Sequence, residues 1–159
     1  MAPDIRARAI DYFKTKGIVW HQGHGDKPNN HMCSSQVCCV NFLFPFAQAS
    51  EESLVELLHP IYPTIKSIMP MDDMNLTFEW IGKENYLGEK IRGARTRGAN
   101  VTSADAAVMF EHQDGSRQFV LIEWKYTESV GNQSLKIAAS GTNRSEIYRK
   151  LYIDPTCNQ

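Results

Sequence analysis

Three ionisable residues in the second half of the chain have the types and spacing of a hydrolytic site. Asp105 precedes Glu123 with seventeen residues between them, and Lys125 follows Glu123 after a single residue. Two carboxylates that share a site repel each other unless a proton or a cation lies between them. An ammonium group beside such a pair could orient a water molecule or stabilise developing negative charge. These residues therefore suggest metal-assisted hydrolysis.

The residues around Glu123 have the pattern of a buried strand. Residues 119–125 are apolar apart from Glu123 and Lys125, and burying either charge alone would be costly. Because side chains alternate along a strand, Glu123 and Lys125 share one face while Trp124 points to the other. The two charges should therefore point toward the same place.

A hairpin decides whether Asp105 meets Glu123. Strands are predicted at 104–111 and 117–126, on either side of a tight turn at Asp114-Gly115. A three-residue loop that ends in a left-handed glycine places the two acids opposite each other. A two-residue loop shifts the register by one position and places the acids on opposite faces of the sheet. The sequence is compatible with both loops.

These residues also match a known catalytic signature. Asp105 followed by Glu123-Trp124-Lys125 resembles the D…(D/E)-x-K motif of the PD-(D/E)XK, or restriction-endonuclease-like, nuclease superfamily. The motif is short, so chance matches to it are common. Ala104 stands where the superfamily has the proline that gives it its name, a replacement that leaves the acids and the lysine in place.

The likeness extends beyond the motif. Residues 100–107 and 121–128 look like a bacterial family of restriction endonucleases within this superfamily. Residues 31–36, continued by Asn41-Phe42, look like the opening helix of that family. The superfamily core continues with a helix and a strand after the lysine strand, and only residues 131–159 remain to supply them. The chain therefore resembles a short member.

The resemblance implies Mg²⁺-dependent cleavage of phosphodiester bonds, with DNA favoured over RNA as the substrate. Asp105, Glu123 and the backbone carbonyl of Trp124 would hold the Mg²⁺, for which Mn²⁺ would substitute. Lys125 would act on the attacking water or on the charge at phosphorus. Glu79 is expected as a further acid, because its predicted strand should lie beside that of Asp105. Glu89 and Glu128 are further candidate acids, and Gln36, Asn41 and Glu128 are candidates to support the site.

A basic segment is the predicted contact with nucleic acid. The whole chain has a net charge of -1, so it lacks a global positive field, and phosphate contacts must come from local groups. A loop rich in glycine and basic residues between residues 83 and 100 supplies such a group. Its cations are Lys90, Arg92, Arg95 and Arg97. A homodimer is the expected assembly if both DNA strands are cut.

The remaining sequence predicts helices that hold this site. An amphipathic helix should open the chain and end at Gly17. An apolar helix should run from a cap at Ser34 or Ser35 to Pro45, and a third helix should begin after Ser50. We expect an α/β (α+β) fold, in which helices flank a small mixed sheet with a central antiparallel hairpin.

The length of the chain favours one domain over residues 1–159. Its helical part should cover 1–70 and its catalytic sheet 74–128, with a further strand at 76–81 and a short helix near 145–151. No stretch approaches the roughly 18 to 20 apolar residues that a membrane span needs, and we expect a cytoplasmic protein. The cysteines show no disulfide framework and should be free thiols. They are Cys33, Cys38, Cys39 and Cys157.

Two other functions fit the same residues. One is a nucleic-acid-binding module that keeps the fold but has lost the metal geometry needed for cleavage. The other is a zinc protein, although the spacing of its candidate ligands fits no standard zinc pattern. Those ligands are His21, His24, His31 and Cys33.

Overall fold

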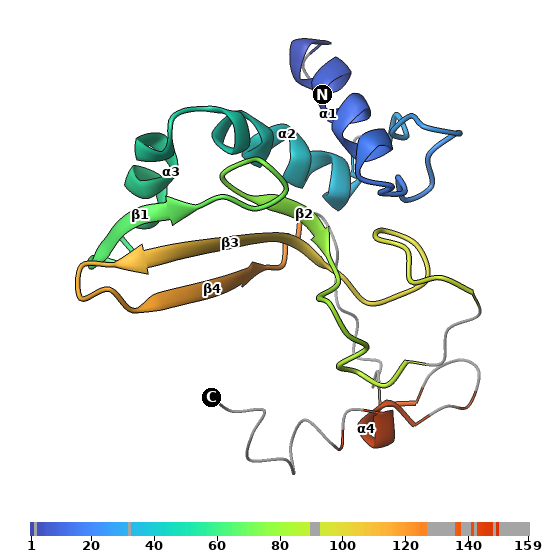
Figure 1. Ribbon diagram of the computed structural model, residues 1–159. Helices are drawn as coiled ribbons and strands as arrows, with labels where there is room; N and C mark the ends of the chain where they lie inside the picture. The colour runs from blue at the N-terminus through green and yellow to red at the C-terminus, as the bar shows by residue number, and fades with distance from the viewer. Residues whose placement is uncertain are drawn as a thin grey trace. The chain divides into compact units, whose positions relative to one another are not determined.

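The computed structural model divides the chain into two compact units (Figure 1). The first unit comprises Met1–Ile81 and Arg95–Thr127, and the second comprises Gly82–Ala94 and Glu128–Gln159. Asp105, Glu123 and Lys125 all belong to the first unit. The residues that the structure describes are 1, 3–31, 33–89, 93–126, 136–137, 141, 143–147 and 149.

Three helices of the first unit pack on one face of its sheet (Figure 1). They are α1 (Pro3–Thr15), α2 (Ser35–Gln48) and α3 (Glu51–Leu58). Ser34 caps α2, because its side-chain oxygen accepts a hydrogen bond from the Val37 N–H at 3.3 Å. The three predicted helices are confirmed. Within the described residues, no helix is long and apolar enough to cross a lipid bilayer.

Helix α2 runs past the proline that was expected to end it. Pro45 is exposed and lies inside the helix, which continues to Gln48. A proline in a helix removes one N–H donor and usually breaks the helix. Here Phe44 and Ala47 are both buried in the core. The burial of apolar side chains on both sides of the proline therefore outweighs the lost hydrogen bond.

The sheet of the first unit is antiparallel in every strand pair that the structure describes. The long strand β3 (Ala104–His112) pairs along one edge with β4 (Arg117–Ile122). Along its other edge it pairs with β1 (Ile65–Met69) and β2 (Thr77–Trp80). The α+β class is confirmed. No parallel pair occurs among the described strands, so the expectation of a mixed sheet is wrong for this part of the chain.

Two strands differ from their predicted bounds. Strand β1 falls within residues 1–70, which were expected to be helical. Its five residues, between Pro63 and Pro70, carry too short a pattern to stand out. Strand β4 ends at Ile122, four residues before the predicted end. The segment from Glu123 onward therefore extends beyond the ladder.

The core lies between the helices and the face of β3 that carries Ala106, Val108 and Phe110, all fully buried. Aromatic side chains fill much of this space. Phe13 of α1 stacks on Trp20 with ring centroids 3.8 Å apart. Burial of such rings, with the aliphatic side chains around them, favours packing of α1 and α2 on the sheet.

The hairpin between β3 and β4 has the three-residue loop. The His112 N–H donates to the Ser116 carbonyl at 2.8 Å, and the Gly115 N–H donates to the His112 carbonyl at 3.0 Å. Gly115 has a φ of 81°, the left-handed conformation that the loop requires. The register that places Asp105 opposite Glu123 is therefore the one found.

The second unit contains α4 (Arg144–Ile147), at the start of the short helix predicted near 145–151. An isolated β-bridge pairs Ile137 with Asn143. Asn85 holds a turn in this unit, since its side chain accepts from the Glu89 N–H at 2.9 Å and donates to the Glu89 carbonyl at 2.7 Å.

Candidate metal and catalytic site

The sheet brings three acidic residues into one row across its strands. Ala106 and Ile122 are the last pair of the β3–β4 ladder on this side, so Asp105 and Glu123 are the next residues opposite each other. On the other edge, β2 pairs with β3 on both sides of Glu79, which places Glu79 opposite Asp105 along the backbone. The prediction that the strand of Glu79 neighbours that of Asp105 is confirmed.

Asp105, the middle acid of the row, is half-buried on β3. Its Oδ2 accepts a hydrogen bond from the Trp124 N–H at 2.6 Å, which ties the segment after β4 to β3. The pKa of Asp105 is raised to about 6: burial is the main cause, the negative charges of Glu123 and Glu79 add to it, and the Trp124 hydrogen bond and the Lys125 charge oppose it. The local field therefore disfavours a charged Asp105.

Glu123 and Lys125 form a pair at the exposed end of the row. The Lys125 Nζ lies 2.6 Å from the Glu123 Oε1, and both side chains are more than half exposed. Exposed pairs of this kind contribute little to stability. Because β4 ends at Ile122, the alternation of side chains expected from a continuous strand does not apply to Glu123 and Lys125. Both residues nevertheless lie close enough to Asp105 for their charges to affect its pKa.

Glu79 is the buried acid of the row, with 6% of its surface exposed. One of its carboxylate oxygens accepts from the Gln36 Nε2 at 2.7 Å, and the other accepts from the Ser103 hydroxyl at 2.5 Å. Its φ of 49° is unusual for a residue with a long side chain inside a strand. Strain of this type is common at functional sites, where surrounding contacts maintain it.

The negative charges of the row also affect the pKa of the Cys39 thiol on α2. Burial raises its pKa strongly, and the charges of Asp105 and Glu79 raise it further. Cys39 is therefore a protonated core residue rather than a nucleophile. The described cysteines are free thiols, as predicted, and Cys157 lies outside the described residues. Those free thiols are Cys33, Cys38 and Cys39.

One comparison identifies the relatives of this chain. The family model for restriction endonuclease associating with ARP (REase-ARP) matches residues 1–159. The chain belongs to the REase-ARP family. Neither the curated proteins nor the solved structures give a match. The family name agrees with the restriction-endonuclease likeness of the sequence.

The REase-ARP chain offers oxygen donors of the kind that a hard divalent cation prefers. Glu123 follows the last residue of the β4 ladder and its charge acts on Asp105, and the raised pKa of Asp105 reflects burial and neighbouring negative charge, which a bound cation would offset. No group of three or more His, Cys, Asp or Glu side chains in the described residues could hold a metal ion. A cation here would thus depend on two carboxylates with backbone and water oxygens. The zinc alternative lacks geometric support, because its four candidate ligands form no such group.

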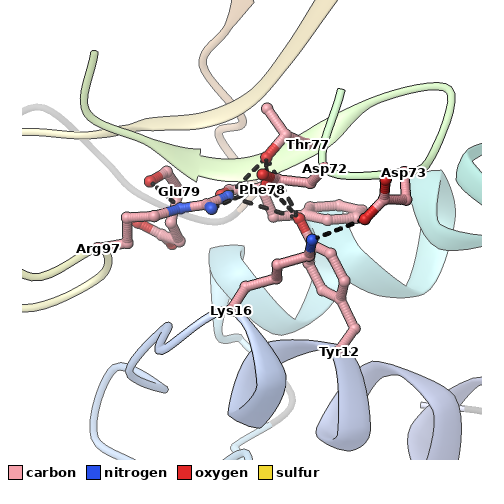
Figure 2. Close-up of polar contacts among 8 residues, drawn as sticks. All are labelled: Tyr12, Lys16, Asp72, Asp73, Thr77, Phe78, Glu79 and Arg97. Atoms are coloured by element: carbon pink, nitrogen blue, oxygen red, sulfur yellow. Dashed lines mark hydrogen bonds and ion pairs between the residues drawn. The ribbon is translucent and has the colours of Figure 1, made fainter. Parts of the chain in front are cut away.

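The Arg97 side chain is mostly buried and makes several polar contacts within the REase-ARP fold (Figure 2). Its guanidinium donates to the Asp72 Oδ2 at 2.8 Å, the Thr77 Oγ1 at 2.5 Å and the carbonyl of Phe78, and its side chain is only 17% exposed. A phosphate contact by Arg97 would have to replace these bonds. We therefore assign Arg97 a structural role and do not include it among the residues proposed to contact nucleic acid.

Arg97 and its partners form a cluster, here called the Arg97 cluster, that joins α1 to β2. Its members are Tyr12, Asp72, Thr77 and Arg97. The Tyr12 hydroxyl donates to the Asp72 Oδ2 at 3.0 Å, and the Thr77 hydroxyl donates to the same oxygen (Figure 2). Burial would raise the pKa of Asp72, but the hydrogen bonds from Thr77 and Arg97 hold it below the usual value. No local pattern predicts this cluster, because Tyr12 and Arg97 are far from Asp72 along the chain.

The other predicted residues have varied positions. Gln36 is buried and bonds Glu79, in keeping with a supporting role. Asn41 is exposed on α2, and Arg95 donates to the carbonyl of Ile81. Glu89 belongs to the second unit. Predictions for Lys90, Arg92 and Glu128 lie outside the described residues. Ser103, which holds Glu79, was missed as a functional candidate.

Proposed function

We propose that this chain is a Mg²⁺-dependent endonuclease that hydrolyses phosphodiester bonds of DNA. Its catalytic residues would be Asp105, Glu123 and Lys125. The observation that carries the proposal is Asp105, whose pKa is raised to about 6 and is affected by the nearby charges of Glu123 and Lys125, which form an ion pair with each other. Membership of a family named for restriction endonucleases supports a nuclease with DNA as substrate.

Asp105, Glu123 and the backbone carbonyl of Trp124 would hold the ion. When bound, Mg²⁺ supplies an activated water and neutralises charge on the phosphate oxygens. The protein's own contribution is to fix the two carboxylates. The Trp124 N–H holds one oxygen of Asp105, and this bond also fixes the backbone on which the Trp124 carbonyl lies. Glu79, held by Gln36 and Ser103, would be a further acid near the ion.

Lys125 would serve the reaction through its exposed ammonium group. In the described structure this group bonds the Glu123 Oε1, and the exposure of both side chains leaves Lys125 able to move at small cost. From this position it can orient the attacking water or stabilise charge that develops on the phosphate. Because one chain would supply a single site, cutting both strands of a duplex would require two copies.

The test is cleavage of supercoiled plasmid and of single-stranded DNA with Mg²⁺ or Mn²⁺. We expect Lys125→Ala and Asp105→Ala to reduce the cleavage rate by at least about 100-fold, the usual effect of removing a group that stabilises the transition state. The control is Asp73→Asn, a change at a side chain that is 96% exposed in another part of the unit. It should cleave at the wild-type rate.

Two results would contradict the proposal. Equal nicking by wild type and Lys125→Ala would indicate a contaminating nuclease. DNA binding without cleavage, together with no Mn²⁺ binding by calorimetry, would instead indicate the non-cleaving binding module. If wild type binds Mn²⁺ and Asp105→Ala does not, the metal assignment is supported independently of turnover.

A further inference from the structure

A pocket of about 280 Å³ opens beside the segment that carries Glu123 and Lys125. Tyr126, the residue after Lys125, forms part of its wall, so the pocket and the proposed catalytic site share one short segment of the chain. Its size is near the lower end of ligand pockets, roughly 300 Å³. The side chains that matter here come from α1, the α1–α2 loop, α2 and the chain after β4. They are Arg6, Asn30, His31, Cys38, Asn41 and Tyr126.

The charge of this pocket favours an anion. None of the described residues that line it is acidic. The Arg6 guanidinium donates to the Asn30 Oδ1 from both terminal nitrogens at 3.4 Å, and no ion pair joins it to a carboxylate in the described part of the chain. Both contacts are long and involve a neutral acceptor. The guanidinium fork therefore retains capacity for a phosphate, which it can bind through two donors.

The uncharged wall of the pocket suits a nucleobase. Tyr126 is exposed, with 57% of the residue's surface accessible, whereas the neighbouring Trp124 packs against the core. Exposed aromatic rings are the usual surfaces on which unpaired bases stack. Asn30 and Asn41 carry carboxamides, each of which has a donor and an acceptor, as the edge of a base does.

We propose that this pocket binds one unpaired nucleotide of the substrate strand. Arg6 would contact its phosphate, and Tyr126 would stack on its base. A paired base is enclosed in the duplex and must leave the stack to enter such a pocket. The inference rests on the proposed nuclease function and narrows its substrate to DNA with a single-stranded, bulged or flipped nucleotide next to the cleavage site.

Binding without divalent metal tests the pocket separately from cleavage. The probes are a DNA strand with 2-aminopurine, a duplex with one unpaired 2-aminopurine, and the fully paired duplex. Wild type should bind the first two at least about 10-fold more tightly than the third, and stacking on Tyr126 should quench their fluorescence. Tyr126→Ala should lose the quenching, whereas Tyr126→Phe should retain it.

Arginine substitutions on α1 provide a matched pair. Arg6→Ala should weaken binding of the unpaired probes about 10-fold, while Arg8→Ala, which removes the same charge from an exposed position, should change it less than about 2-fold. Asn41→Asp, an isosteric change at an exposed helix position, should also weaken binding because it places a carboxylate at the pocket. Circular dichroism would confirm that each variant is folded.

Three results would overturn the inference: equal effects of Arg6→Ala and Arg8→Ala, equal affinity for paired and unpaired probes, or quenching that survives Tyr126→Ala. The assignment to the substrate strand would also be overturned by two results together: a deoxynucleoside monophosphate competes with the probes, and Arg6→Ala leaves the binding of the strand probes unchanged. If plasmid is cleaved but these tests fail, the nuclease proposal stands without the pocket. If the tests succeed but nothing is cleaved, the pocket stands and the nuclease proposal fails.

Discussion

The first unit contains two groups of charged residues in which the pKa of an aspartate is shifted in opposite directions. In the Arg97 cluster, Asp72 receives hydrogen bonds from Tyr12, Thr77 and Arg97, and its pKa is held below the usual value. In the row of acids, burial and neighbouring carboxylates raise the pKa of Asp105 to about 6. Each acid lies near a basic side chain, yet only for Asp72 does the pKa stay below its usual value.

The difference separates a structural charge from a functional one. Arg97 donates its hydrogen bonds to groups that hold α1 and β2 together. Lys125 bonds the exposed Glu123, and its charge lowers the pKa of Asp105 less than the neighbouring acids raise it. A structure that leaves carboxylates in mutual repulsion loses stability for no structural gain. Perturbed groups of this kind are concentrated at sites that bind ions or perform catalysis.

The largest expected effect on stability is that of breaking the Arg97 cluster. Asp72→Asn should lower the free energy of unfolding by about 2 to 3 kcal/mol, because Arg97 would lose its charged partner while remaining mostly buried. This is less than for a fully buried pair, since the Asp72 side chain is 28% exposed. The midpoint of thermal unfolding should fall by roughly 5 to 10 °C.

The neighbouring aspartate provides the control for this change. Asp73→Asn removes the same charge from a side chain that is 96% exposed and paired with Lys16. Its unfolding midpoint should stay close to that of wild type. A similar loss of stability for both variants would show that net charge, rather than the buried cluster, determines the effect.

An opposite, smaller effect is expected in the row of acids. Asp105→Asn should raise the free energy of unfolding by about 1 to 2 kcal/mol at pH 7, a value reduced from the full pKa shift because Asp105 is partly solvated. An acid with a raised pKa in the folded state lowers stability as the pH rises through that pKa. The gain should therefore appear as the pH rises from 4 through 6 and should vanish below about pH 4.

Chemical denaturation at several pH values would measure this gain. Glu111→Gln, on the same strand, is the control. A hydrogen bond from Lys66 and its charge lower the pKa of Glu111, so this variant should gain no stability. If Asp105→Asn is destabilised at pH 7 as well as at pH 4, the carboxylates are not in repulsion.

The smallest effect is expected for Lys125. Lys125→Ala should change the free energy of unfolding by less than about 0.5 kcal/mol, because its pair with Glu123 is exposed on both sides. The same variant should lose cleavage. Thermal unfolding measured on the protein sample used for cleavage would check both statements. A large loss of stability would mean that Lys125, like Arg97, is a structural residue.

Local signals in the sequence predicted a substantial part of this structure. The caps and apolar spacing located the first three helices, and Asp114-Gly115 located the hairpin. The alternative loop lengths could be stated in advance, but the choice between them depends on which face of β3 packs against the helices. That choice is made by tertiary packing, which local turn residues do not determine.

What could not be predicted depends on contacts between distant residues. Arg97 reads as one more cation in a basic loop, and its partners Tyr12 and Asp72 lie 85 and 25 residues away. Pro45 reads as the end of a helix, because the buried residues that favour continuation are visible only in the folded core. The pocket near Tyr126 likewise draws its residues from segments that are far apart in the sequence.

The loop of the β3–β4 hairpin has a consequence for how this site tolerates insertions and deletions. Its three residues, Gln113, Asp114 and Gly115, are exposed, and substitutions at Gln113 should be harmless, whereas Asp114 accepts two hydrogen bonds from Ser116 and Gly115 is left-handed. Loss or gain of a single residue would slide one strand past the other and turn Asp105 away from Glu123. The site thus depends more on the length of this surface loop than on its composition. Deleting one loop residue, far from the acids, should abolish the activity of the site.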